Sequence, residues 1–286
     1  MPSRSISLQP QNGSSSIIAI NCGSSSPRLG GAVNISSFQN IAEFRCNNND
    51  ITAITGYSNN SNLQVLEFFN NKVTGSLSSL STCTELQEIQ CGNNLLSGSL
   101  PTISSLVNLT VFHCFTNQFS GSIPAFPSSI ASVSLHTNQF TGSIPSLTTC
   151  TDLNTFHCFT NQLTGSIPNL SSNINLVDFR CQTNQLTGSI PNLSTCTQLT
   201  TFLCDNNQLT NFTGGSVSNT LGYFQAHNNQ LPSSAINAIL AAFVAANRTS
   251  GTRILNLSGA GNVAPTGQGI TDKVTLISRG WTVLTN

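Results

Sequence analysis

Charge is what this 286-residue chain has least of. Asp, Glu, Lys and Arg make up only 6% of its residues, against about 25% in an average soluble domain. The nine basic and nine acidic side chains cancel to a formal net charge of zero, so the chain has no basic field that would hold nucleic acid or an anionic membrane. Most of its polarity comes from Ser, Thr, Asn and Gln, which predicts a surface rich in hydroxyl and amide groups.

Long apolar runs are also missing. None reaches the roughly 18–20 residues that a membrane span needs, so no membrane insertion is expected. The first residues, MPSRSISLQPQNGSSS, contain no apolar segment of the kind found in a Sec-type signal peptide. The sequence has no G-x-S-x-G elbow, phosphate loop or paired-carboxylate constellation. We therefore expect a protein that is not an enzyme and needs no cofactor.

A repeat of 21 to 23 residues is the main positive feature of the sequence. Ile or Leu lies eight residues before a recurring asparagine, and a second apolar residue lies five before it. Cys, Phe, Leu or Ala lies three residues before the asparagine, and another apolar residue lies two after it. The unit is therefore L-x-x-L-x-C-x-x-N-x-L, often followed by T-G-S-I-P. We call the recurring residues the ladder asparagines: Asn49, Asn71, Asn94, Asn117, Asn138, Asn161, Asn184, Asn207 and Asn229.

This pattern resembles the leucine-rich repeat family over about residues 35–231, in nine repeats. The tails at Thr141–Pro145, Thr164–Pro168 and Thr187–Pro191 are similar to those of the plant-type subclass. The resemblance implies a right-handed α/β-type solenoid with a parallel β-sheet on its concave face and little regular helix. The residues agree, because a unit this short cannot bury its own apolar face, whereas stacked units bury a continuous core. Each ladder asparagine is expected to bond to backbone groups in the turn after its strand.

The two ends of the chain differ from the repeats. Residues 1–34 are rich in Ser, Gly and Gln, and we expect an N-terminal arm, a cap or an anchor to other subunits. Residues 232–286 are expected to form a C-terminal cap of helices and strands that covers the open repeat end. Within this segment, residues 255–283 resemble the end cap of leucine-rich repeat proteins from bacteria and their phages. The expected elements are a helix capped by Ser233 or Ser234, a strand at 253–257, a helix at 272–279 and a strand at 281–284.

Nine of the ten cysteines occupy inward positions of the repeat. Six stand where the family usually has a strand leucine, and Cys83, Cys150 and Cys196 lie three residues before the first leucine of their repeats. We expect these nine to act as small hydrophobic core residues, because a reactive thiol needs exposure and a lowered pKa. A disulfide such as Cys83–Cys91 is possible, but free thiols are expected. Cys22, outside the repeats, is the candidate for an exposed or crosslinking thiol.

Residues that alternate with the inward ones point to the opposite face of each strand. This outward, concave face is expected to carry all four histidines and seven of the eighteen charged side chains. Aromatic, His and Arg side chains together are typical of recognition surfaces, although duplication of an H-C-F triplet would also repeat two of these histidines. The predicted ligand-binding residues are Phe69, His113, Phe115, His136, His157, Phe159, Arg180, Tyr223 and His227.

A metal site is a more specific alternative to the interpretation of the histidines as ligand-binding residues. His113 and His157 are expected two strands apart, with His136 on the strand between them, so two imidazoles could reach one ion. No carboxylate or thiolate is expected to converge with them, and we therefore predict no metal site.

The sequence favours binding over catalysis, with three candidate roles. The first is a phage virion surface protein or bacterial adhesin, at the virion or cell surface, that binds a protein or glycan on a host or cell. The second is a decoration or assembly subunit that docks on other virion or surface-assembly subunits through residues 1–34. The third is an ice- or matrix-binding solenoid, suggested by two hydroxyl rows that turn chemistry also explains. These rows are Thr116, Thr137, Thr160 and Thr183, and Thr74, Ser97, Ser120, Thr141, Thr164, Thr187 and Thr210.

Overall fold

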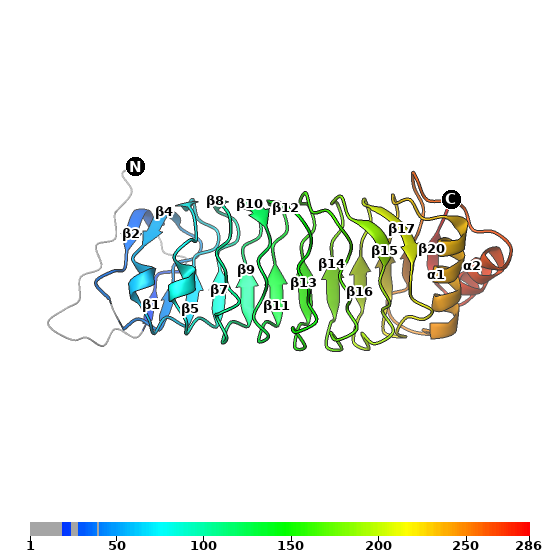
Figure 1. Ribbon diagram of the computed structural model, residues 1–286, viewed down its shortest axis with the longest axis horizontal. Coiled ribbons are helices and arrows are strands. Elements are labelled where there is room, and N and C mark those ends of the chain that lie inside the picture. The colour runs from blue at the N-terminus through cyan, green and yellow to red at the C-terminus, as the bar shows by residue number, and fades with distance from the viewer. Residues whose placement is uncertain (1–18, 24–27, 39) are drawn as a thin grey trace. The chain divides into compact units, whose positions relative to one another are not determined.

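The computed structural model describes residues 19–23, 28–38 and 40–286. The chain forms two compact units, Met1–Phe140 and Thr141–Asn286. In each unit, short parallel strands lie side by side, and each strand is followed by a turn and a mostly irregular return segment (Figure 1). Each unit is therefore a parallel β-solenoid of the leucine-rich repeat type, with little regular helix, as the repeat pattern predicted.

The main sheet of the first unit aligns the same repeat position in every strand. Phe44 pairs with Leu66, and Leu66 pairs with Ile89. Its strands are β1 (Ala19–Asn21), β3 (Glu43–Arg45), β5 (Val65–Glu67), β7 (Glu88–Gln90), β9 (Val111–His113) and β11 (Ser132–Ser134). Smaller parallel sheets follow the ladder asparagines, formed by β2 (Gly30–Asn34) with β4 (Asp50–Thr55) and by β6 (Thr74–Gly75), β8 (Leu95–Gly98) and β10 (Gln118–Ser122). The 3-10 helices are η1 (Tyr57–Asn59) and η2 (Leu80–Thr82), and β12 (Gln139–Thr141) spans the boundary between the units.

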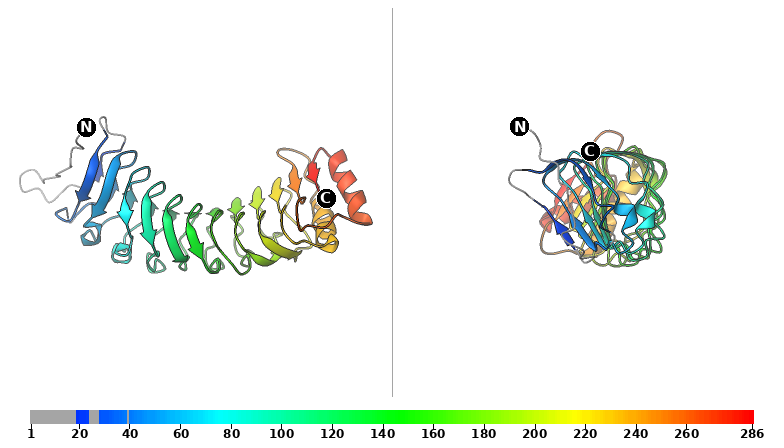
Figure 2. Two further views of the ribbon diagram at one scale, coloured as in Figure 1. Left: turned by 90° about the horizontal axis from the view of Figure 1, so that it is seen from above. Right: turned by 90° about the vertical axis from the view of Figure 1, so that its left-hand side faces the viewer.

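The second unit repeats this arrangement and ends in two helices. Its main sheet contains β13 (Thr155–His157), β14 (Asp178–Arg180), β16 (Thr201–Leu203), β18 (Tyr223–Gln225), β19 (Ile254–Asn256) and β20 (Thr282–Leu284). A second pair is β15 (Thr187–Ile190) with β17 (Gln208–Phe212). Helix α1 (Ser233–Ala246) packs against α2 (Gln268–Ser278), and Figure 2 shows both helices at the C-terminal end of this unit.

The described part of residues 1–34 belongs to the first unit. β1 pairs in register with β3, with Ile20 opposite Phe44, and a disulfide joins Cys22 to Cys46. The prediction that Cys46 is a core thiol is therefore wrong in one respect. Its side chain is buried, but β1 brings Cys22 beside it and the two are oxidised. Residues 1–18 and 24–27, on which docking to other subunits would depend, lie outside the described residues.

The ladder asparagines join each repeat to the one before it. Asn117 Nδ2 donates to the carbonyl oxygens of Cys114 and Phe115, both at 3.2 Å, and of Cys91 in the preceding repeat, at 3.0 Å. Its Oδ1 accepts the Leu96 N–H at 3.0 Å. The sequence predicted the bonds within the turn but not those to the neighbouring repeat. The same pattern is formed by Asn49, Asn71, Asn94, Asn138, Asn184, Asn207, Asn229 and, in the C-terminal cap, Asn262.

The core of the second unit is a stack of phenylalanine rings. Phe156, Phe179, Phe202 and Phe224 are fully buried and stack in succession, with ring centroids 5.3–5.7 Å apart. The cap ends this stack with edge-on contacts. Phe243 of α1 meets Phe224 at 5.3 Å, and Trp281 meets Phe243 at 5.2 Å. Edge-to-face rings pack well, so the cap covers the apolar end of the stack.

The boundaries of the cap helices differ from those predicted. α1 begins at Ser233, with Pro232 at the N-cap position and no side-chain cap bond, so neither predicted serine caps it. The φ of −71° at Pro232 is fixed by its ring and already suits a helix start. α2 begins four residues before the predicted Asp272, and Gln268 Nε2 donates to Asp272 Oδ1 across the first turn at 2.9 Å.

Replacing a ladder asparagine tests the role of these bonds. Asn117→Ala removes the partner of three carbonyl groups and one N–H. We expect the free energy of unfolding to fall by about 2–4 kcal/mol, because a buried polar group left unpaired costs roughly 1–3 kcal/mol. Urea unfolding measures the change, with Gln118→Ala at the exposed neighbouring position as control. Equal stability of the two variants would show that the ladder does not hold the repeats together.

The numbers of buried, free and disulfide-bonded cysteines can be measured. Cys22 and Cys46 form a disulfide and the other eight cysteines are buried thiols. Burial raises the pKa of Cys114, Cys158 and Cys181, because a thiolate is poorly solvated in the core. Titration with a chromogenic disulfide reagent should find almost no thiols in the native protein, eight after denaturation and ten after reduction. Fast native labelling of these three thiols would contradict the inward register.

Candidate functional site

The outward surface of the main sheet in each unit is called the sheet face, and it corresponds to the concave face of the family. Each repeat presents three outward positions, which lie six, four and two residues before the ladder asparagine. All nine predicted ligand-binding residues occupy such positions, and all are half-buried rather than fully exposed. Five further outward residues are buried, contrary to expectation: Val65, Gly92, Ser134, Leu203 and Asp205.

Aromatic and imidazole rings pack together on the sheet face of the first unit. Phe115 and His136 stack with centroids 4.9 Å apart and an angle of 14° between the rings. Gly92 makes room for this pair, since a Cβ at that position would lie 2.6 Å from Phe115 Cζ. His113 Nε2 lies 2.8 Å from Ser132 Oγ. One face of the Phe115 ring is therefore covered by His136, and the role of Gly92 was not predicted from the sequence.

The sheet face of the second unit carries a pair of charged clusters, of which the first is built on Asp178. Arg180 Nε and Nη2 donate to both oxygens of Asp178 at 2.7–3.0 Å, and His157 Nε2 lies 3.2 Å from Oδ2. Burial alone would raise the pKa of Asp178, but the bonds and charges of His157 and Arg180 outweigh it and lower the pKa. The predicted ligand contact Arg180 is thus already engaged by a carboxylate of the chain.

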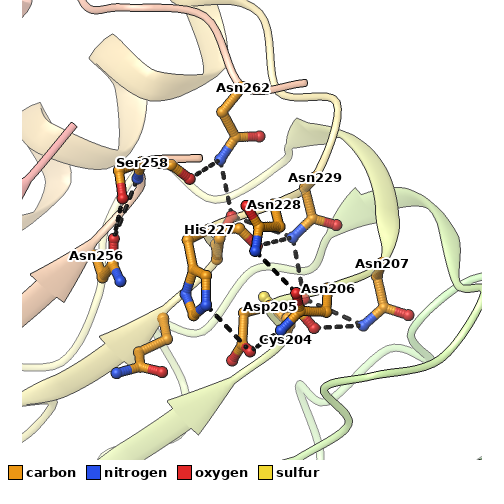
Figure 3. A network of polar contacts seen from close by, with 12 residues as sticks. Cys204, Asp205, Asn206, Asn207, His227, Asn228, Asn229, Asn256, Ser258 and Asn262 are labelled. Carbon is orange, nitrogen blue, oxygen red and sulfur yellow. Dashed lines mark hydrogen bonds and ion pairs between the residues drawn. The ribbon is translucent and has the colours of Figure 1, made fainter. Parts of the chain in front are cut away.

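The second cluster is built on Asp205, the most deeply buried acid of the sheet face (Figure 3). Its Oδ2 accepts a bond from Asn206 Nδ2 at 2.6 Å and lies 3.5 Å from His227 Nε2. Burial raises the pKa of Asp205, and the opposing effects of His227 and Asn206 do not cancel this. Neither Asp178 nor Asp205 was among the predicted site residues. The sequence does contain a signal that could have identified these clusters: an Asp and a His occupy outward positions of consecutive repeats.

Strained threonines border the sheet face. Thr116 and Thr137 in the first unit, and Thr160 and Thr183 in the second, have φ values of 50–58°. Asparagine fills the same position in the other repeats and tolerates this left-handed conformation, whereas a β-branched residue there is strained by about 1–3 kcal/mol. These threonines belong to the repeats that carry the predicted residues from His113 to Arg180.

The other hydroxyl row makes structural contacts. Thr74, Thr187 and Thr210 each donate to a carbonyl oxygen of the preceding repeat at 3.3–3.4 Å. This supports turn chemistry as the reason for that row. Among the described residues, no group of three or more His, Cys, Asp or Glu side chains is placed to hold a metal ion. No helix in the same residues is long and apolar enough to cross a membrane.

Comparison with known proteins identifies similar solenoids. No protein-family model matches the chain, and no curated protein matches it. A TDR receptor structure is 27% identical with a TM-score of 0.68, covering 75% of this chain and 40% of that one. The ectodomain of the Arabidopsis thaliana receptor kinase GASSHO1/SCHENGEN3 is 27% identical with a TM-score of 0.65, covering 84% and 29%. That of the Arabidopsis receptor kinase HAESA is 23% identical with a TM-score of 0.68, covering 81% and 40%.

These likenesses agree with the repeat pattern, the parallel sheet and the asparagine ladder. The chain is a leucine-rich repeat protein. It spans less than half the length of each of the three receptor structures. Proteins of this class are typically non-enzymatic binding domains that use the concave face, which is the sheet face here.

The two aspartates should affect stability in opposite directions. A raised folded-state pKa means that ionised Asp205 costs stability once the pH exceeds its unfolded pKa, so Asp205→Asn should raise the free energy of unfolding at pH 7 by about 1 kcal/mol. A lowered pKa means that Asp178 stabilises the fold above its unfolded pKa and loses this effect as the pH falls through the folded pKa. Asp178→Asn should therefore lower the free energy of unfolding at pH 7 by about 1 kcal/mol.

Urea unfolding of both variants and the wild type at pH 7 and pH 3 measures these differences. Both should shrink at pH 3, below the usual Asp pKa of 3.8. Changes of the same sign at pH 7 would contradict the two environments described for these carboxylates.

Proposed function

We propose that this protein is a non-enzymatic recognition protein that binds a protein or glycan ligand through its sheet face. The observation that carries the proposal is the set of half-buried aromatic, imidazole and guanidinium side chains that the sheet face carries in each unit. Such side chains offer large contact area at low entropic cost and are common among the residues that dominate binding energy. The strained threonines along the border support it, because strained backbone is retained where ligands are held.

The similar structures also support ligand binding. The GASSHO1/SCHENGEN3 ectodomain is in complex with Casparian strip integrity factor 2. An extended peptide that lies perpendicular to the strands would meet the outward residues of a new strand about every 4.8 Å. A sheet face of this kind suits a peptide, or a glycan of similar length.

An extracellular or surface location fits this role. The Cys22–Cys46 disulfide supports it, because disulfides persist in oxidising compartments. Within that setting we favour a virion surface protein or a bacterial adhesin that recognises a host surface. The support is the resemblance of residues 255–283 to the end caps of bacterial and phage proteins of this family.

Phe115→Ala and Phe159→Ala test the sheet face. Ligands would be selected on the wild type from a displayed random-peptide library and from a glycan array, and then titrated against each variant. We expect at least about tenfold weaker binding, or roughly 1.4 kcal/mol, because both rings contribute contact area. Circular dichroism should show an unchanged fold, since neither ring belongs to the buried core.

The matched control is Thr164→Ala, an exposed hydroxyl away from the sheet face. It should bind as the wild type does. If both Phe variants bind normally and Thr164→Ala does not, the binding surface is the hydroxyl row and the proposal is wrong.

A further inference from the structure

Three side chains form a row at the same outward position of consecutive repeats in the second unit. Gln182, Asp205 and His227 each lie two residues before a ladder asparagine. Backbone bonds show that they are neighbours, since Thr183 N–H donates to the Asp205 carbonyl and Asn206 N–H to the His227 carbonyl, both at 3.0 Å. Neighbouring strands lie about 4.8 Å apart, so the row is about 10 Å long.

Each member of this row has a buried polar atom without a hydrogen-bond partner among the described residues. The atoms are Gln182 Oε1, Asp205 Oδ1 and His227 Nδ1. Asp205 is only 5% exposed, so solvent does not replace the missing partner of its carboxylate. Buried polar atoms in folded proteins are nearly always paired, and an unpaired one costs roughly 1–3 kcal/mol. Three in one row indicate a place where a ligand supplies the partners.

The chemistry of the three atoms is the same. An ionised carboxylate only accepts hydrogen bonds, and so does the oxygen of a glutamine amide. His227 Nε2 lies 3.5 Å from Asp205 Oδ2, and in the neutral tautomer with the proton on Nε2 the Nδ1 atom has a free lone pair. Gln182 Oε1 and ionised Asp205 Oδ1 are therefore acceptors, His227 Nδ1 is a third acceptor in that tautomer, and we call the three atoms the acceptor row.

We propose that the acceptor row binds a cationic group with several N–H donors, the guanidinium or ammonium of an arginine or lysine side chain on a protein ligand. This inference rests on the proposed function and specifies the ligand for one part of the sheet face. A guanidinium has five N–H donors in a planar fork and an ammonium has three. Either can bond more than one acceptor at once, and its charge complements Asp205.

The surroundings of the row favour an external cation. Arg180, on the same face, is held by both oxygens of Asp178 and does not supply donors to Asp205. Burial raises the pKa of Asp205 more than the neighbouring groups of the chain lower it, so the chain compensates the charge of this carboxylate only in part. Figure 3 shows His227 beside Asp205. The His227 side chain is 22% exposed and that of Asp205 is 8% exposed, so the imidazole ring is the more accessible of the two groups to a ligand.

Capped pentapeptides, acetyl-Gly-Gly-Xaa-Gly-Gly-amide, test this proposal. Xaa is Arg, Lys, citrulline or Glu, and each peptide is titrated into the protein at low ionic strength. NMR follows the imidazole signals of the four histidines, with the His227 signal assigned by its loss in His227→Gln. The Arg and Lys peptides should shift the His227 signal saturably. The citrulline peptide, which keeps the shape of arginine without its charge, should not.

Two variants separate this site from general charge attraction. Asp205→Asn should weaken binding at least about tenfold. Asp152→Asn removes the same charge from an exposed position of the same unit, away from the sheet face, and should bind as the wild type does. Equal binding by the two variants would overturn the proposal. Equal binding of the citrulline and arginine peptides, or no shift of the His227 signal by either cationic peptide, would also overturn it.

The proposed function can survive that failure. Ligands selected on the wild type are also titrated against Asp205→Asn. Ligands that need Phe115 or Phe159 but bind equally to Asp205→Asn would overturn the acceptor row and leave recognition by the sheet face intact. Because Asp205→Asn is expected to be more stable than the wild type, loss of binding by this variant would not be caused by unfolding.

Discussion

The hydrogen bonds of the ladder asparagines are the interaction on which the rest of the structure depends. One amide side chain satisfies carbonyl groups in its own turn and in the preceding repeat, and accepts an N–H from the segment after the preceding ladder residue. No other uncharged side chain of that length offers two donors and an acceptor in one plane. The bonds fix the register of neighbouring strands, and every alignment of side chains across the sheets follows from that register.

Register has different consequences on the two sides of the strand. On the inner side it aligns phenylalanines with phenylalanines and cysteines with cysteines, so that the Phe rings stack and the cysteines are buried. On the outer side it brings equivalent residues of consecutive repeats within reach of one another. Phe115 meets His136, and Asp205 meets His227. A binding surface built in this way consists of rows, and a single substitution changes one position along a row.

Scarcity of charge gives the few ionised groups of the sheet face large effects. Asp178 is compensated by Arg180 and His157, whereas Asp205 is held in the fold at a cost that the chain does not fully offset. Two aspartates of the same sheet face therefore have opposite effects on stability at neutral pH. The protein retains a destabilising acid and strained threonines on or beside the sheet face, where uncompensated interactions are available to a ligand.

The sequence by itself determined the solenoid, the inward positions, the identity of the outward face and most of the C-terminal cap, because a 21- to 23-residue period with apolar residues at constant offsets has few other ways to bury its core. Only the tertiary structure decided which outward residues meet. It showed that Gly92 leaves room for the Phe115 ring and that Cys22 forms a disulfide with Cys46. It also showed that Arg180 is hydrogen-bonded to Asp178 and that Asp205 is buried with one carboxylate oxygen unpaired. These facts depend on distances between strands that are more than 20 residues apart in the chain. A repeat pattern specifies which face a side chain joins, whereas the rotamers and packing of its neighbours decide whether it finds a partner there.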